Sequence, residues 1–108
     1  MYRNSIYENP YFIEVTAYVL LVFACRSVQH DTFTVSSALR RLGPFAHFFW
    51  IDVEKVLKDK HYIEPHNSSD SAYEITSAGQ SFANSFRVQN NIDLDKSPME
   101  IIMSIYNR

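Results

Sequence analysis

Two pairs of basic residues are the first candidates for chemistry in this sequence. Arg40 and Arg41 are adjacent, and Lys55 and Lys58 are three residues apart, a spacing that places both lysines on one face of a helix. Cations in such pairs suit the phosphate oxygens of DNA, which supply most of the affinity of DNA-binding proteins. Polar side chains nearby can add contacts to base edges. The resulting candidates for binding double-stranded DNA are Arg40, Arg41, His47, Lys55, Lys58, Asn67 and Ser68.

A run of bulky aromatic residues precedes the two lysines, from Phe45 to Trp50. On a helical wheel centred on Val53, Phe48 and Ile51 fall among charged residues on the outer face. Bulky apolar side chains are favoured at the centre of protein interfaces, whereas base edges are read mainly by polar or small side chains. The alternative interpretation is therefore a protein–protein interaction surface without DNA binding, which uses Phe48, Trp50 and Ile51. A third interpretation is that these side chains belong to the core.

Residues for metal binding or catalysis form no recognisable pattern. The four histidines and Cys25 lack the close pairing that is typical of zinc sites. The carboxylates are scattered, and the sequence has no glycine-rich phosphate loop and no nucleophile motif. We expect no enzymatic activity, no catalytic residue, no metal and no cofactor.

Composition limits the class of protein. The chain has 108 residues, enough for one domain, and 46% are hydrophobic and 15% aromatic, which excludes a disordered chain. A net charge of -2 is unlike that of a strongly basic nucleic-acid-binding protein and favours the protein-binding alternative. One cysteine excludes an internal disulfide, so we expect a cytoplasmic protein. The most apolar run, Val15 to Cys25, is shorter than the roughly 20 residues of a membrane-spanning helix, so we expect no membrane partner.

The elements that position these residues begin with a helix from Asn9-Pro10 to about Ser27. Asn is a favourable N-cap, and Pro fits the first helical position. This helix is apolar on nearly every side, so either the other helices or a second chain must cover more than one of its faces. We expect a homodimer through the first and last helices. Its interface candidates are Tyr18, Leu21, Ile102, Met103 and Tyr106.

Two further helices are expected before a hairpin. Thr34 is placed to cap a short helix from Val35 to Leu42, which ends at Gly43-Pro44. A third helix is expected from Phe45 to about Lys60, with one stripe facing the core. The stripe comprises Ala46, Phe49, Trp50, Val53, Val56 and Leu57.

The remaining part of the chain combines a hairpin with two helices. Strand-forming residues at His61–Glu64 and Ala72–Thr76 flank a loop rich in turn formers. Thr76 is placed to cap a fourth helix, and Ser97 and Glu100 predict a capping box at the start of the last helix. The apolar faces expected for these two helices are Ala78, Phe82 and Phe86, and Met99, Ile102, Met103 and Tyr106, respectively.

The order of these elements resembles a winged helix-turn-helix domain. Ala38-Leu39-Arg40-Arg41-Leu42-Gly43 resembles the start of the helix-turn-helix in bacterial MarR-like and PadR-like transcriptional regulators. Leu57-Lys58-Asp59-Lys60-His61-Tyr62-Ile63-Glu64 is similar to the end of their recognition helix and the entry into the wing, where those families usually have Gly in place of Lys60 or His61. Tyr73-Glu74-Ile75-Thr76-Ser77-Ala78-Gly79-Gln80 resembles the exit from the wing, in which Thr is followed by two residues and Gly.

The resemblance covers roughly residues 34–86 and implies a mainly α fold with a small two-stranded antiparallel hairpin. The implied architecture is a winged helix-turn-helix with extra N- and C-terminal helices. It implies a single domain over 1–108, with the helix-turn-helix at about 34–60, the wing at about 61–76 and the C-terminal helices at 77–107. The function that it implies is that of a dimeric DNA-binding transcriptional regulator.

Overall fold

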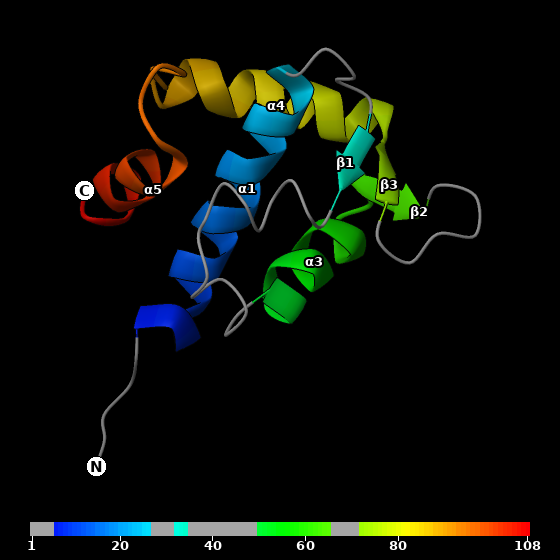
Figure 1. Ribbon diagram of the computed structural model, residues 1–108, viewed down its shortest axis with the longest axis horizontal. Helices are drawn as coiled ribbons and strands as arrows, with labels where there is room; N and C mark the ends of the chain where they lie inside the picture. Colours follow the sequence, from blue (N-terminus) through cyan, green and yellow to red (C-terminus); the bar gives the residue numbers. More distant parts are fainter. Residues whose placement is uncertain (1–5, 27–31, 35–49, 66–71) are drawn as a thin grey trace.

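The computed structural model describes residues 6–26, 32–34, 50–65 and 72–108 (Figure 1). The predicted helix Val35–Leu42, the Gly43-Pro44 turn and the start of the predicted third helix lie outside the described residues. In chain order, the elements are a 3-10 helix Ile6–Glu8, α1 Pro10–Arg26, β1 Thr32–Thr34, α3 Trp50–Asp59, β2 Ile63–Pro65, β3 Ala72–Ile75, α4 Ser77–Gln89 and α5 Pro98–Tyr106. The described part of the chain is thus mainly helical with a β-hairpin, as predicted.

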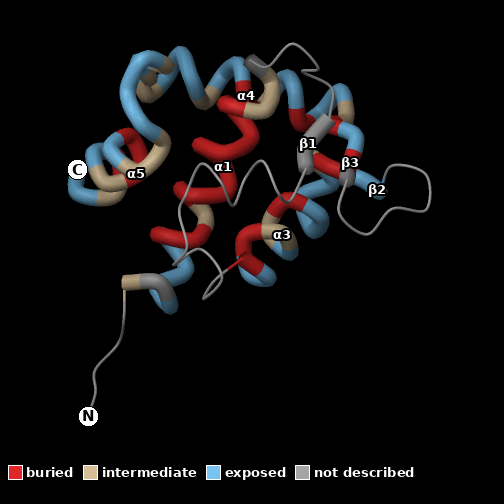
Figure 2. Tube along the Cα trace, in the orientation of Figure 1, coloured by how far each residue is buried: buried red, intermediate tan, exposed pale blue. Residues whose placement is uncertain are grey.

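Helix α1 is the centre of the fold. It begins as predicted, because the Asn9 side-chain oxygen accepts hydrogen bonds from the backbone N–H groups of Tyr11 and Phe12, at 2.8 and 3.2 Å. Figure 2 shows α1 buried along most of its length, with α3, α4 and α5 around it. Helix α1 is therefore covered by other helices of the same chain, which is the first of the two alternatives that its sequence left open.

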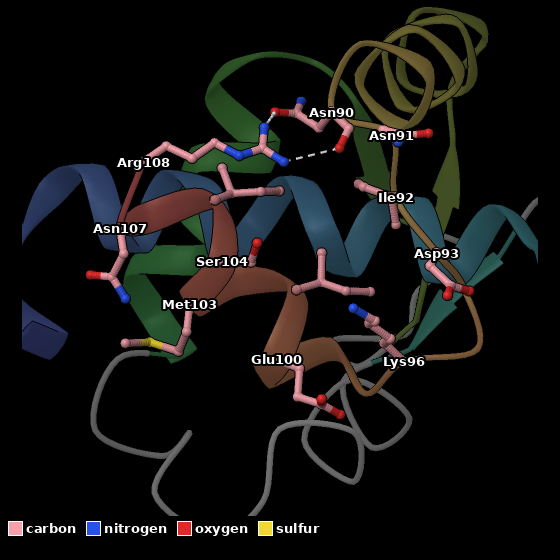
Figure 3. Close-up of a pocket in the computed structure, with 12 residues that line it drawn as sticks. Asn90, Asn91, Ile92, Asp93, Lys96, Glu100, Met103, Ser104, Asn107 and Arg108 are labelled. Atoms are coloured by element: carbon pink, nitrogen blue, oxygen red, sulfur yellow. Dashed lines mark hydrogen bonds between the residues drawn. The ribbon is translucent and has the colours of Figure 1, made fainter.

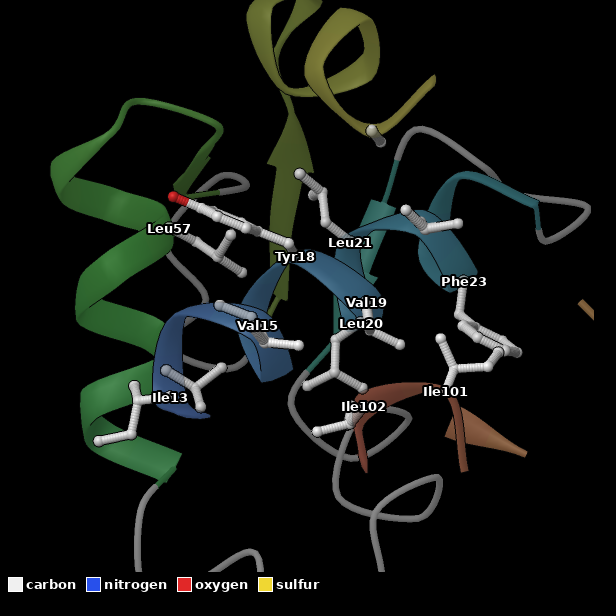
Figure 4. Close-up of a cluster of buried hydrophobic side chains, with 14 of the residues drawn as sticks. Ile13, Val15, Tyr18, Val19, Leu20, Leu21, Phe23, Leu57, Ile101 and Ile102 are labelled. Atoms are coloured by element: carbon white, nitrogen blue, oxygen red, sulfur yellow. The ribbon is translucent and has the colours of Figure 1, made fainter. Parts of the chain in front are cut away.

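The predicted homodimer interface falls largely in this core. Tyr18, Leu21 and Ile102 are buried within one chain and face neighbouring helices rather than solvent (Figure 4). Met103 and Tyr106 are half-buried and pack against the same core. The prediction that Tyr18, Leu21 and Ile102 lie at a dimer interface was therefore wrong. Apolar spacing alone does not distinguish a core from an interface.

Three antiparallel strands form the sheet, in the order β1-β3-β2. The β2–β3 hairpin is confirmed, with Ile63 opposite Ile75 and Pro65 opposite Tyr73. Strand β1 was not predicted: Phe33 lies opposite Tyr73 and so adds a strand on the other side of β3. A strand of this length has too few residues to show alternation, and its place is fixed by pairing with β3.

A left-handed residue ends α3. His61 has φ 62°, its N–H donates to Lys58 O at 3.0 Å, and the Tyr62 N–H donates to Leu57 O at 3.0 Å. These two bonds are those of a Schellman motif with His61 at the position that glycine usually fills. His61 thus stands where the resembling families have Gly, and it adopts the conformation for which Gly is suited.

Replacing His61 by glycine is expected to raise the free energy of unfolding by about 0.5–1 kcal/mol, because Gly relieves the strain of a positive φ. Urea unfolding followed by circular dichroism measures the change. Lys60→Gly is the matched control, since Lys60 does not have a positive φ, and it should lower stability. A His61→Gly protein no more stable than the wild type would contradict this explanation.

Thr76 and Gly79 fasten the hairpin to α4. Thr76 Oγ1 accepts a hydrogen bond from the Gly79 N–H at 3.0 Å and donates one to His61 O at 2.7 Å. The Thr76 N–H donates to Tyr62 O at 3.0 Å. A Cβ added at Gly79 would lie 2.3 Å from that same Tyr62 oxygen, closer than any Cβ approaches a backbone atom. The motif of Thr, two residues and Gly therefore serves to bring α4 against the turn that follows α3.

Helix α5 begins with the predicted capping box. Ser97 Oγ accepts from the Glu100 N–H at 3.3 Å, and Glu100 Oε1 accepts from the Ser97 N–H at 3.4 Å. Its buried face was only partly predicted, since Ile102 is in the core but Ile101 and Ile105 are more buried than Met103 and Tyr106. Figure 4 shows Ile101 and Ile102 directed at α1.

Aromatic residues join α1, the entry to β2 and α4. The Tyr18 ring centroid lies 4.5 Å from that of Phe82 and 5.4 Å from that of Phe86, and Tyr62 stacks on Phe82 at 4.7 Å. Burial, followed by the nearby Glu14 carboxylate, raises the pKa of Tyr18 to about 12. Some of the many aromatic residues therefore pack elements together that are far apart in the sequence.

Candidate nucleic-acid interface

Helix α3 presents one face to the core and the other to solvent. Trp50, Val53 and Leu57 are buried, as the wheel predicted for this stripe. Trp50 is only 8% exposed, so it packs inside the domain and was wrongly included among the residues of a surface. Ile51 is 75% exposed, as the wheel predicted for the outer face. Lys55 and Lys58 are exposed as well.

Lys55 is held by an ion pair within α3. Its Nζ lies 2.8 Å from Asp59 Oδ2, and the two side chains are 69% and 62% exposed. The hydrogen bond to Asp59, together with its negative charge, raises the pKa of Lys55, so the ammonium stays charged at neutral pH. An exposed pair of this kind contributes only about 0.2–1 kcal/mol, but Lys55 must give up that contribution before it can bind another anion.

Lys58 has different surroundings from Lys55. Its Nζ lies 5.7 Å from the centroid of the Tyr73 ring, within the range of a cation–π interaction. The Tyr73 hydroxyl donates a hydrogen bond to Glu54 Oε2, and Glu54 precedes Lys58 by one helical turn. The buried Tyr73 ring thus connects the hairpin to the face of α3 that carries Lys58.

The formal charges of α3 and the turn after it are balanced. The cations are Lys55, Lys58 and Lys60, and the anions are Asp52, Asp59 and the half-buried Glu54. The β2–β3 hairpin follows at once, and Figure 1 shows it beside the C-terminal end of α3.

Of the predicted site, the structure brings together Lys55, Lys58 and the neighbouring Ile51. The other candidates, Arg40, Arg41, His47, Phe48, Asn67 and Ser68, lie outside the described residues. Sequence reasoning missed the contacts of Tyr73 with Glu54 and with Lys58. Tyr73 lies in the predicted strand Ala72–Thr76, but its contact to Glu54 depends on how the folded hairpin lies against α3.

Two hollows lie away from α3. The larger has a volume of about 450 Å³ between the end of α4 and α5, and Arg108 spans it by donating to Asn90 Oδ1 at 2.9 Å and Asn90 O at 3.1 Å (Figure 3). The smaller, about 310 Å³, lies beside Cys25, and burial raises the pKa of that thiol. Among the described residues, no three His, Cys, Asp or Glu side chains are grouped closely enough to hold a metal ion.

Within the described ranges, every helix is too short or too polar to cross a membrane. Comparison with protein-family models, with curated proteins and with solved structures finds no match to this chain.

Proposed function

We propose that this chain is a winged helix-turn-helix protein that binds double-stranded DNA and regulates transcription. The observation that carries the proposal is that α3 is anchored in the core by one face and presents Lys55 and Lys58 on the other, next to the hairpin. The described elements from α3 through β2 and β3 to α4 follow the order that the sequence resemblance implies.

In this proposal, α3 is the helix that approaches the groove and the β2–β3 hairpin is the wing. Lys55 and Lys58 contact phosphates, which position the domain on the duplex without reading its sequence. Arg40 and Arg41 add phosphate contacts, and His47, Asn67 and Ser68 approach bases. The tight junction of Thr76 and Gly79 supports the proposal, because it fixes the wing relative to α3 and lets the two act together.

The salt dependence of DNA binding tests the roles of the lysines. A Lys55→Gln/Lys58→Gln protein is expected to bind a labelled duplex more weakly than the wild type at every salt concentration. The slope of log Kd against log salt concentration should fall by about 1–2, because each lost phosphate contact removes about 0.9 from it. Fluorescence anisotropy between about 50 and 200 mM salt measures both quantities.

Lys96→Gln is the control, since Lys96 is an exposed lysine in the segment between α4 and α5. It removes the same charge from the protein and should leave the slope unchanged. Equal slopes for the wild type and the double variant would contradict a phosphate role for α3. Absence of wild-type binding at about 50 mM salt would contradict DNA binding as a whole.

The exposed side chain of Ile51 favours a second candidate function, a winged-helix module that binds another protein and not DNA. Contiguous exposed apolar patches mark protein interfaces, and Ile51 is the described member of the surface predicted with Phe48. Affinity capture from the native host with wild-type and Ile51→Asp proteins distinguishes the two functions. Loss of a captured partner in Ile51→Asp, together with no DNA binding by the wild type, would favour the protein-binding module.

The homodimer stays a prediction. Its interface must lie outside Tyr18, Leu21 and Ile102, because the domain's own core already covers these residues. Size-exclusion chromatography with light scattering measures the mass directly, and a clean monomer would exclude the dimer.

A further inference from the structure

The two lysines on the exposed face of α3 differ in whether a carboxylate neutralises them. Lys55 is paired with Asp59, four residues further along the helix, at 2.8 Å. Lys58 also has a carboxylate four residues away in the sequence, but on the N-terminal side, at Glu54. Glutamate four residues before lysine is the more favourable order for an ion pair within a helix. Among the residues that the structure describes, Lys58 nevertheless has no ion-pair partner.

Tyr73 explains why Glu54 and Lys58 do not pair. Its hydroxyl donates a hydrogen bond to Glu54 Oε2, and Lys58 Nζ lies over the ring, 5.7 Å from its centroid. Tyr73 is buried, and its backbone lies in the central strand β3, paired with Phe33 of β1 on one side and Pro65 of β2 on the other, so its position is fixed. Glu54 is thus held at the hydroxyl end of the ring while Lys58 lies over the ring face.

We propose that Tyr73 is a positioning residue that holds Glu54 away from Lys58, so that Lys58 binds a DNA phosphate more strongly than Lys55 does. This inference rests on the proposed DNA-binding function. A quadrupole attracts a cation less strongly than a carboxylate does and leaves the ammonium hydrogens exposed. Lys58 is therefore pre-oriented without being neutralised, whereas Lys55 must first leave Asp59.

Tyr73→Phe tests the inference because it removes the hydroxyl and keeps the ring. Glu54, released from Tyr73, is then expected to pair with Lys58. The variant should bind duplex DNA about fivefold more weakly at 0.15 M salt and lose about 0.9 from the salt slope, the effect of one lost phosphate contact, although no cation has been removed. Adding Glu54→Gln removes the competing carboxylate, so the Tyr73→Phe/Glu54→Gln protein should regain wild-type affinity and slope.

The single lysine variants test the second half of the inference without altering Tyr73. Lys58→Gln should lose about 0.9 from the slope, and Lys55→Gln clearly less, since Asp59 already competes for Lys55. In the free protein, nuclear Overhauser contacts between the Glu54 γ-protons and the Lys58 ε-protons should be stronger in Tyr73→Phe than in the wild type. A purely structural role of Tyr73 predicts no such contact and no recovery by Glu54→Gln.

The outcomes separate this inference from the function on which it rests. Wild-type binding with an unchanged slope in Tyr73→Phe would overturn the inference and leave DNA binding intact. A larger loss in Lys55→Gln than in Lys58→Gln would overturn it as well. Failure of the wild type to bind duplex DNA at about 50 mM salt would overturn the function, and the inference with it.

Discussion

Replacing Gly79 by alanine is expected to lower the free energy of unfolding by about 3 kcal/mol. In an exposed helix the same substitution would raise it by about 1 kcal/mol, because alanine is the best helix former. Gly79 is buried near the start of α4, where a Cβ would meet Tyr62 O at 2.3 Å and Ile75 Cγ2 at 3.1 Å. The Tyr62 oxygen also accepts the Thr76 N–H and cannot withdraw without breaking that hydrogen bond.

Urea unfolding measures the change, and Ser81→Ala is the matched control. Ser81 is exposed in the same helix, so its replacement by alanine should leave stability unchanged or slightly raised. A Gly79→Ala protein as stable as the wild type would contradict the close approach of α4 to the turn after α3. It would also indicate that the junction of Thr76 and Gly79 does not fix the hairpin relative to α3.

A second large loss of stability is expected from a substitution in the core. Leu21→Ala should lower the free energy of unfolding by about 3–4 kcal/mol, because Leu21 is fully buried in α1 and its loss leaves a cavity. The loss should not depend on protein concentration, since the residues around Leu21 come from the same chain. Chemical unfolding at two concentrations that differ about tenfold measures both the size of the change and its concentration dependence.

Val88→Ala is the control for this substitution. Val88 is 64% exposed on α4, so the shortened side chain should change stability by less than about 0.5 kcal/mol. An unfolding midpoint that rises with protein concentration in the wild type and not in Leu21→Ala would place Leu21 at an interface between two chains. That result would restore the dimer interface first predicted for α1.

Local signals in the sequence predicted where three of the helices begin. Asn9, Thr76 and Ser97 each cap a helix where a capping side chain precedes an apolar pattern. The periodicity of α3 also predicted its buried stripe, because this helix has a polar face that contrasts with the apolar one. These features depend on residues within one or two helical turns.

Features that depend on distant partners could not be predicted from the sequence. Strand β1 exists because Phe33 pairs with Tyr73, about forty residues later. The sequence showed that α1 must be covered on more than one face. It did not show whether the covering elements belong to the same chain. In α5 most positions are apolar, so the pattern did not distinguish the buried Ile101 and Ile105 from the half-buried Met103 and Tyr106.

The same distinction applies to the candidate site. Charge and spacing identified Lys55 and Lys58, and the structure places both on the exposed face of α3. The difference between them arises from Tyr73, which reaches α3 only through the folded hairpin. No spacing rule within α3 would have shown that Glu54, the natural partner of Lys58, is bound elsewhere.

An NMR titration with a short DNA duplex tests most directly whether the exposed face of α3 binds double-stranded DNA. We expect the amide signals of Ile51, Lys55 and Lys58, and those of the β2–β3 hairpin, to shift when the duplex is added at about 50 mM salt and to return as the salt concentration is raised. Signals of α5 should stay in place. A spectrum that the duplex leaves unchanged, or shifts confined to α4 and α5, would contradict DNA binding by α3.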